Sequence, residues 1–226
     1  MPPGLNTASL CVAAFLLGGV PFGLLLGRLA GVDIRELGSG NIGATNLTRA
    51  LGRKWGIAAF VLDFTKGCIP VMVADQVVRK WPANFALAEG GWPIVLVGVA
   101  AIAGHIYPVY LGFRGGKGVS TVFGVVTACT WISALAAGVT WLALFRTTRI
   151  VSAASLAAAV VLPLSVFVLH RIAPMSAYAA VQSLTLAATA LVFYRHGSNI
   201  RRLMSGRELR FAPPPSTESE REKRGD

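Results

Sequence analysis

The sequence predicts an all-α integral membrane protein whose helices form a seven-helix transmembrane bundle. Three observations carry this prediction. Hydrophobic residues make up 54% of the 226 positions and charged residues only 14%, whereas a soluble domain usually has about a quarter charged residues. Mean hydropathy is +0.62. The apolar segments are also long, and a helix needs about 20 residues to cross a bilayer.

Apolar segments separated by short polar connections account for most of the chain. They cover residues 7–30, 55–78, 91–111, 119–145, 150–169 and 175–194. No basic residue precedes the first segment, which is unlike a secretory signal peptide, so we expect a retained span with its N-terminus outside. We expect residues 1–210 to form one transmembrane domain. The proline-led, charged residues 211–226 cannot bury apolar surface and should form a disordered cytoplasmic tail.

The segment 119–145 decides the topology. As a single span it would scatter the basic connections over both sides of the membrane. As a hairpin of two short helices that turns near Thr130, it places most Lys and Arg residues on one side. Cytoplasmic loops carry an excess of Lys and Arg, so the hairpin is favoured. Each short helix would have about 13 residues and span about 20 Å. The C-terminus is then cytoplasmic, together with residues 31–54, 112–118 and 195–210.

The net charge of +11 would suggest nucleic acid in a soluble protein. Here the basic residues lie in connections between apolar segments, without the interleaved aromatic residues of single-strand binders. We therefore predict no nucleic-acid partner. The cysteines, Cys11, Cys68 and Cys129, each lie within an apolar segment. Their odd number and wide spacing predict neither disulfides nor a metal site.

The stretch "GFRGGKGVST", residues 112–121, only partly matches a P-loop. Leu111 stands where the pattern needs its first glycine, and Gly118 replaces the hydroxyl residue after Lys117. A glycine-rich backbone beside an ammonium can still hold a phosphate group. We predict such an anion site here. Its expected members are Gly115, Gly116, Lys117 and Gly118.

Residues 35–54 are rich in small polar side chains. They include the spacing Gly38-x-Gly40-x-x-Gly43, but this dinucleotide fingerprint needs a preceding strand, which an all-α chain cannot provide. Hydroxyl, amide and guanidinium groups can donate to a phosphate, whereas the alternative is a solvated loop ending in a short surface helix. The candidate ligands are Ser39, Asn41, Thr45, Asn46 and Arg49.

Two further places carry unusual polar residues. Asp63 and Lys66 lie three apart inside an expected span, where ionisable residues are functional candidates and a structural ion pair is the equal alternative. After the last span, His196 and Asn199 share one helix face. A basic patch against anionic lipid would account for Arg201 and its neighbour, but not for this pair or for Glu208.

Together, the stretches "GSGNIGATNLTRALG", "GHIYPVYLGFRGGKGVST" and "RHGSNIRRLMSGRE" resemble the three cytoplasmic motifs of the bacterial acyl-phosphate:glycerol-3-phosphate acyltransferases. The resemblance implies transfer of a fatty acyl group from acyl phosphate to the 1-hydroxyl of sn-glycerol 3-phosphate in phospholipid biosynthesis. The products are lysophosphatidic acid and phosphate. It implies a multi-pass protein of the bacterial cytoplasmic membrane in contact with lipid, with no metal and no other cofactor.

The resemblance also assigns roles to residues. It implies catalytic roles for Ser39, Lys117, His196 and Asn199. It implies substrate binding by Asn41, Thr45, Asn46, Arg49, Gly115, Gly116, Gly118 and Glu208. Gly197 stands where relatives often carry a larger, basic residue. Oligomeric state and acyl-chain preference are not determined by the sequence.

The expected chemistry is direct attack of the acceptor hydroxyl on an acyl phosphate, which is already activated. The enzyme then positions its substrates and stabilises charge. The sequence contains no Ser-His-Asp or Cys-His arrangement for an acyl-enzyme. Either His196 or a phosphate oxygen of the substrate could accept the proton. The rival hypothesis is a transporter for small phosphorylated anions, which would place its site near the membrane midplane.

Overall fold

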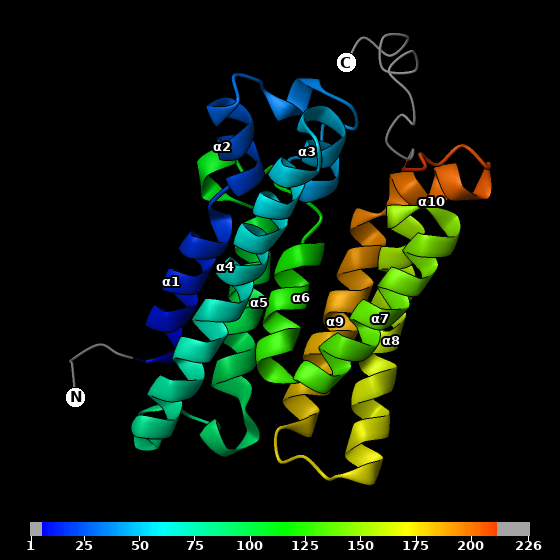
Figure 1. Ribbon diagram of the computed structural model, residues 1–226. Coiled ribbons are helices and arrows are strands. Elements are labelled where there is room, and N and C mark those ends of the chain that lie inside the picture. The colour runs from blue at the N-terminus through cyan, green and yellow to red at the C-terminus, as the bar shows by residue number, and fades with distance from the viewer. Residues whose placement is uncertain (1–5, 212–226) are drawn as a thin grey trace, which may run out of the picture.

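The computed structural model describes residues 6–211, which form α-helices and short 3-10 helices. Residues 212–226, most of the expected disordered tail, lie outside the described part of the chain, as do residues 1–5. Figure 1 shows the long helices side by side, with α1 to α6 on one side of the molecule and α7 to α10 on the other. The all-α expectation is therefore confirmed for the described residues.

By length and apolar composition, helical stretches at Thr7–Leu29, Arg53–Lys80, Trp92–Leu111 and Val151–Ile172 could cross a membrane. The first contains α1 (Thr7–Gly19) and α2 (Phe22–Leu29), and the second is α4 (Arg53–Lys80). The third contains α5 (Trp92–Ile106) and the 3-10 helix η4 (Val109–Leu111), and the fourth is α8 (Val151–Ile172). The remaining apolar helices are α6 (Val119–Cys129), α7 (Trp131–Thr148) and α9 (Tyr178–Arg195).

The shorter helices lie in the connections. They are α3 (Ala44–Leu51), α10 (Gly197–Met204), and the 3-10 helices η1 (Ile34–Glu36), η2 (Pro82–Asn84) and η3 (Ala88–Gly90). Figure 1 shows α3 and α10 at the same end of the bundle, although they lie far apart in the sequence.

The apolar run 119–145 divides into two helices, as the hairpin prediction requires. Thr130 separates α6 from α7 and has a non-helical backbone, with φ −158° and ψ 84°. The expectation of two short helices is correct for α6, with 11 residues, and wrong for α7, with 18 residues. In the last turn of α7, the Thr147 and Thr148 hydroxyls donate to carbonyls one turn back. The helix ends where Arg149 adopts a left-handed conformation.

Small residues allow the helices to approach at backbone distance. A Cβ added at Gly104 of α5 would lie 2.1 Å from the carbonyl oxygen of Phe15 in α1. A Cβ at Gly124 of α6 would lie 2.1 Å from the carbonyl oxygen of Phe64 in α4. Close packing of this kind is typical of helices in lipid, where association relies on van der Waals contact rather than on the hydrophobic effect.

A buried ion pair joins α4 to the break between α1 and α2. Lys66 Nζ lies 2.8 Å from Asp63 Oδ1, and both side chains are buried. The same ammonium donates to the carbonyl oxygen of Val20, at 2.7 Å. Val20 is the C-cap of α1, and its carbonyl also accepts from the N–H of Phe22, the first residue of α2, at 3.1 Å. The predicted pairing of Asp63 with Lys66 is confirmed, and it ties three helices together.

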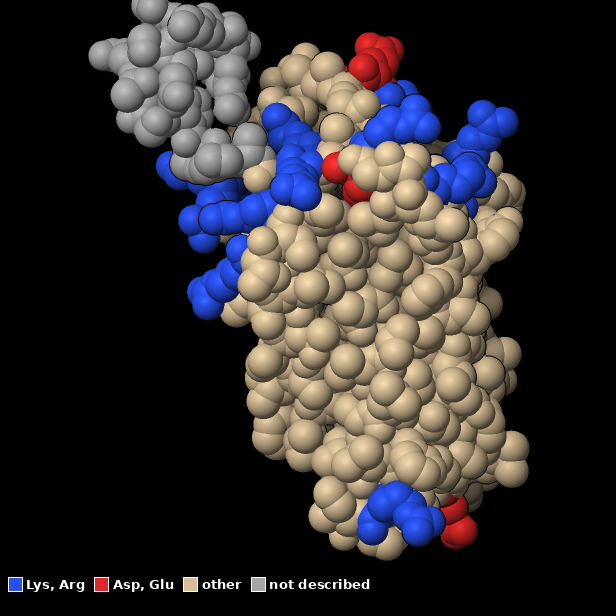
Figure 2. Space-filling model, turned by 90° about the vertical axis from the view of Figure 1, so that its right-hand side faces the viewer, with Lys and Arg blue, Asp and Glu red and all other residues tan. Residues whose placement is uncertain are grey.

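The charged residues gather at the ends of the bundle. Figure 2 shows Lys and Arg side chains concentrated at the end that carries α3 and α10, with an uncharged middle and a few charges at the opposite end. Large apolar side chains are exposed along the middle, such as Val61, Leu135 and Leu164. Exposed apolar surface on this scale suits a lipid environment rather than water.

Candidate active site

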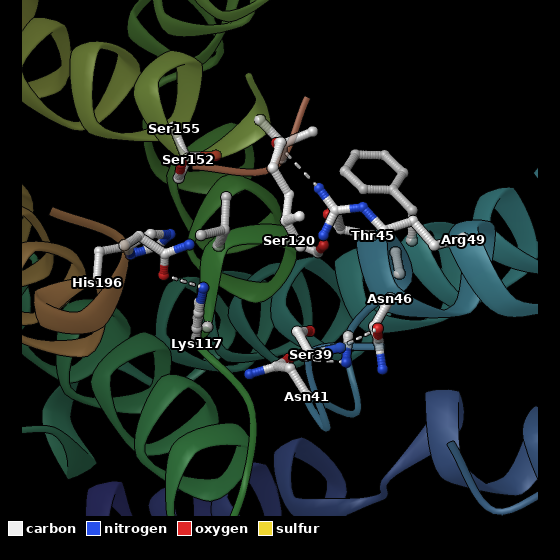
Figure 3. Close-up of a pocket in the computed structure, with 18 of the residues that line it drawn as sticks. Ser39, Asn41, Thr45, Asn46, Arg49, Lys117, Ser120, Ser152, Ser155 and His196 are labelled. Atoms are coloured by element: carbon white, nitrogen blue, oxygen red, sulfur yellow. Dashed lines mark hydrogen bonds between the residues drawn. The ribbon is translucent and has the colours of Figure 1, made fainter. Parts of the chain in front are cut away.

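A small cavity of about 150 Å³ lies at the basic end of the bundle. Three polar segments that lie far apart in the chain contribute to its walls, as the motifs predicted. Its lining contains Ser39, Asn41, Thr45, Asn46, Arg49, Lys117, Gly118, His196, Asn199 and Glu208. Figure 3 shows Ser39, Asn41, Arg49 and Lys117 arranged around one space, coming from the first two of these segments. Of the predicted site residues, only Gly115 and Gly116 do not line it.

Four α-helices begin at this cavity. Residues of the first turns of α3, α6, α8 and α10 line it, among them Thr45, Ser120, Ser152 and Asn199. The first N–H groups of a helix have no acceptor within the helix, and the helix dipole adds partial positive charge there. Helix N-termini therefore bind phosphate and other anions readily. Four of them around one cavity, together with Arg49 and Lys117, strongly favour an anionic ligand.

Lys117 is the basic residue at the centre of the cavity. Its ammonium donates to Oδ1 of Asn199, on α10. Burial is the main cause that lowers the pKa of Lys117 to about 8; Glu208 opposes the shift, and the neighbouring arginines add to it. Lys117 is thus mainly protonated at neutral pH, and its charge is lost just above that range.

Glu208 fixes the orientation of Asn199. Its Oε1 accepts from Asn199 Nδ2 at 2.5 Å and from Ser152 Oγ at 2.8 Å, and its Oε2 accepts from Arg202 Nε at 2.7 Å. Burial raises the pKa of Glu208, but these three hydrogen bonds outweigh burial and leave the pKa below its usual value. The geometry therefore makes Glu208 an orienting residue for Asn199. Its predicted role in binding substrate stays a prediction, and an ionised carboxylate could serve it only by accepting from a hydroxyl rather than by contacting phosphate.

His196 is buried at the junction of α9 and α10, with 3% of its surface exposed. Its Nδ1 lies 2.8 Å from the carbonyl oxygen of Val192. A carbonyl only accepts, so Nδ1 carries the hydrogen and Nε2 holds the lone pair of the neutral ring. Burial and the nearby Lys117 charge lower the pKa of His196 to about 4. The ring is therefore neutral at physiological pH.

Asn46 builds the first polar loop. Its Oδ1 accepts from the N–H of Ser39 at 2.9 Å, and its Nδ2 donates to the carbonyls of Ile34 and Leu37 at 3.1 and 2.9 Å. The side chain is 1% exposed. Both amide hydrogens are engaged, so the expectation that Asn46 donates to substrate is wrong. Instead Asn46 holds the loop that presents Ser39 to the cavity.

Arg49 lies at the wall between the cavity and a second, larger one. Its Nη2 donates to the carbonyl of Leu209 at 3.4 Å, and its guanidinium lies 5.2 Å from the ring centre of Phe211. Burial lowers the pKa of Arg49, although the group remains charged. Phe211 is anchored in turn by its N–H, which donates to the carbonyl of Arg149 at 2.8 Å. The chain after α10 thus closes one side of the site.

The second cavity is an apolar groove of about 1260 Å³ between α4, α6, α7 and α8. Aliphatic and aromatic side chains dominate its lining, including Ile57, Phe123, Leu142 and Leu162. It shares Arg49, Phe60, Trp141 and Leu209 with the small polar cavity, so the two are neighbours with a common wall. The sequence did not predict this groove, because its residues look like ordinary membrane-span residues.

The glycine loop differs from our expectation. The N–H of Gly115 donates to the carbonyl of Ile106 at 3.0 Å, and the N–H of Gly116 donates to that of His105 at 3.3 Å. These groups cannot face an anion, so predicting Gly115 and Gly116 as ligands is wrong. A Cβ on Gly116 would lie 2.3 Å from His105 Nε2, which explains why a glycine is needed there. Gly118, with φ +81°, starts α6 at the cavity as expected.

Several residues of the site were missed in the sequence. Arg195 donates from Nη2 to the carbonyls of Gly115 and Gly116. Ser152 and Ser155 line the cavity from α8, and His105 lines it from α5. Asp63, which lines it from α4, was already a functional candidate in the sequence. The only sequence signal was for the serines, which lie three apart in an otherwise apolar segment. Within residues 6–211, no group of three or more His, Cys, Asp and Glu residues could hold a metal ion.

Comparison with known proteins places these features in a family. The family model for glycerol-3-phosphate acyltransferase matches residues 8–206. The chain is 43% identical over 202 residues to a glycerol-3-phosphate acyltransferase of Aquifex aeolicus (strain VF5), covering 89% of this chain and 97% of the relative. A relative from Anaeromyxobacter sp. (strain Fw109-5), of the same description, is 44% identical over 203 residues, covering 89% and 95%.

Solved structures agree with this family. The crystal structure of PlsY (YgiH), an integral membrane glycerol 3-phosphate acyltransferase, in its glycerol 3-phosphate form matches with a TM-score of 0.80 and 42% identity, covering 91% of this chain and 96% of that one. Its lysophosphatidic acid form matches with a TM-score of 0.78. The fold is thus that of an integral, multi-pass helical membrane protein. The chain belongs to the glycerol-3-phosphate acyltransferase family.

Proposed function

We propose that this chain transfers a fatty acyl group from acyl phosphate to the 1-hydroxyl of sn-glycerol 3-phosphate, giving lysophosphatidic acid and phosphate. One observation carries the proposal beyond the family relationship. A small basic cavity, ringed by helix N-termini, shares a wall with a large apolar groove. A water-soluble phosphate ester and a lipid tail can therefore reach the same point.

The polar cavity suits the phosphate groups of both substrates. Lys117 and Arg49 supply full positive charges, and the helix N-termini supply N–H donors. We assign Lys117 to the phosphate of glycerol 3-phosphate, and Arg49, at the wall next to the groove, to the acyl phosphate. Ser39, Asn41 and Thr45 supply further polar side chains within the same lining.

The apolar groove suits the acyl chain. Its volume and its aliphatic and aromatic lining can enclose a long hydrocarbon tail. The common wall at Phe60 and Trp141 would hold the acyl carbonyl at the entrance to the polar cavity. The tail then stays in an apolar medium while its head group reacts at the polar end of the bundle.

The chemistry needs no acyl-enzyme. The oxygen of the acceptor hydroxyl forms a bond to the acyl carbonyl carbon, the bond from that carbon to the phosphate oxygen breaks, and phosphate leaves with the electron pair. The hydroxyl proton passes to a base. With its pKa lowered to about 4, His196 is a weak base, so a phosphate oxygen of the substrate is the favoured acceptor. His196 and Asn199 then orient the hydroxyl, and Glu208 orients Asn199.

The placement in the membrane is also part of the proposal. The basic end, with α3 and α10, would face the cytoplasm of a bacterial cell and the N-terminus would lie outside, as the positive-inside rule requires. Single cysteines can be introduced at Gly40 and Ser198 in a cysteine-free background. In intact cells neither should react with a membrane-impermeant maleimide, and both should react once the membrane is permeabilised. Labelling of the two positions from opposite sides would refute this topology.

The decisive experiment uses the purified protein in detergent. Incubation with palmitoyl phosphate and labelled glycerol 3-phosphate should release phosphate and form lysophosphatidic acid in equal amounts. A transporter needs a sealed vesicle and forms no product, so absence of both products from a folded, monodisperse preparation would favour the transporter hypothesis. The polar groups of the site lie at one end of the bundle, which already speaks against a midplane transport site.

A further inference from the structure

We propose that Arg195 is a positioning residue for acyl transfer, which locks the glycine loop so that Lys117 stays in the phosphate site. The proposal rests on the proposed function, because that function assigns Lys117 to glycerol 3-phosphate. Arg195 begins the third motif, but the resemblance gave it no role. The proposal supplies one and explains how the second and third motifs are held together.

The contact joins two distant parts of the chain. Arg195 is the last residue of α9, and its Nη2 donates to the carbonyl oxygens of Gly115 and Gly116 at 3.1 and 3.0 Å. The two carbonyls directly precede Lys117. Hydrogen bonds from a charged donor are about twice as strong as neutral ones, so the guanidinium is a firm anchor for this part of the loop.

The loop needs such an anchor. Four of its residues, at positions 112–118, are glycines, which leave the backbone many conformations. On one side, the N–H groups of Gly115 and Gly116 are bonded to the end of α5. On the other, Arg195 holds their carbonyls. The peptide groups just before Lys117 are therefore fixed between α5 and α9.

Arg195 also fixes the position of the glycine loop, in the second motif, relative to α10, in the third. It directly precedes His196, and Asn199 lies one helical turn later on α10. The residue that anchors the loop is therefore four positions from Asn199, which accepts from Lys117. The ammonium of Lys117 and the amide oxygen of Asn199 are brought together by this short connection.

Arg195 acts through the loop rather than on the substrate. It does not line the polar cavity, whereas Lys117, His196 and Asn199 do. Its donating nitrogen faces backbone carbonyls of the loop. Lys117, His196 and Asn199 therefore face the substrate site, whereas the Arg195 guanidinium donates to the loop that carries Lys117.

The test is a steady-state comparison of Arg195→Gln with the wild type. We expect the KM for glycerol 3-phosphate to rise roughly tenfold to a hundredfold, the effect of losing one or two hydrogen bonds to a charged group. The KM for acyl phosphate should change less than threefold. Arg195→Lys keeps a cationic donor and should recover part of the loss. Arg201→Gln removes the same charge from an exposed position on α10 and is the matched control.

A double-mutant cycle separates positioning from general destabilisation. If Arg195 acts through Lys117, then Lys117→Ala/Arg195→Gln should have the same KM for glycerol 3-phosphate as Lys117→Ala, within about twofold. The proposal would be overturned if the KM increases of the two single variants multiply in the double variant, or if Arg195→Gln leaves the KM unchanged. If Arg195→Gln fails to fold, the same cycle is run with Arg195→Lys. A wild-type protein without acyltransferase activity would instead refute the proposed function.

Discussion

The ammonium of Lys117 donates to the side-chain oxygen of Asn199, 82 residues later in the chain. The amide nitrogen of Asn199 donates in turn to Glu208 at 2.5 Å. This relay fixes both ends of the Asn199 amide, with oxygen toward the cation and nitrogen toward the carboxylate. The glycine loop, α10 and the segment after it are thereby joined at one point of the polar cavity.

Removing the Lys117 charge should weaken binding of glycerol 3-phosphate. Lys117→Ala should raise its KM at least tenfold, because a charge-assisted contact to phosphate contributes ~1.5–3 kcal/mol. Arg114→Ala, an exposed cation in the same loop, is the control and should stay within about threefold of wild type. An unchanged KM for Lys117→Ala would remove Lys117 from the phosphate site.

The pH dependence of binding should follow Lys117. Burial lowers its pKa to about 8, so the charged form dominates below pH 8 and is lost as the pH rises through that value. The KM for glycerol 3-phosphate should therefore rise above pH 8. Lys117→Arg should abolish this rise, since an arginine stays charged. An identical alkaline rise in Lys117→Arg would assign it to another group.

The pH dependence of kcat below neutral pH should reflect the protonation state of His196. Burial lowers the pKa of His196 from its ordinary 6.5 to about 4, so the ring is already neutral at pH 5.5. We expect no inflection of kcat near pH 6.5 that belongs to His196. A step near pH 6 that comes from the substrate phosphate should persist in His196→Gln. A clear step near pH 6.5 that disappears in His196→Gln would mean that the ring is more solvated than this structure shows.

Gly116 should tolerate no side chain. Gly116→Ala would place a Cβ 2.3 Å from His105 Nε2, so the loop or the ring must shift and Lys117 moves with it. We expect kcat/KM to fall by more than a factor of about ten, since a poorly placed group loses most of its effect. Gly197→Ala is the matched control, because open space surrounds that position. It should retain activity and gain slightly in melting temperature.

The groove should set the acyl-chain preference. Gly138 lines it opposite Phe123, and Gly138→Leu would shorten the available space. Each buried methylene contributes ~0.8 kcal/mol, so excluding three or four of them should lower kcat/KM for long chains roughly a hundredfold. Short-chain acyl phosphates should be little affected. Leu135→Phe, on the exposed side of the same helix, is the control. Equal loss for all chain lengths would contradict an acyl groove.

The Asp63–Lys66 pair should behave as a structural unit. Lys66→Met leaves a buried carboxylate without its partner and should destabilise the protein by ~3–5 kcal/mol. Asp63→Asn/Lys66→Met removes both charges and should restore most of the melting temperature in detergent. If the double variant is stable but loses kcat, Asp63 acts in the reaction, in keeping with its place in the cavity lining.

Composition and local pattern were enough for the helical class, the break at Thr130 and the three polar segments that line the cavity. The reason is that hydropathy and charge are properties of short segments, and a bilayer imposes the same length on every span. Ser39, Lys117 and Asn199 could be named for a similar reason. They lie in short polar connections between apolar spans, where packing in the bilayer does not require such side chains.

Tertiary structure alone decided which groups are free to act. The N–H groups of Gly115 and Gly116 and the amide of Asn46 looked like ligands in the sequence, yet backbone partners from other segments engage them. Arg195 looked like one more basic residue, yet it faces two carbonyls about 80 residues away. Hydrogen-bond pairing depends on which segments meet after the helices pack, and a linear pattern does not contain that information.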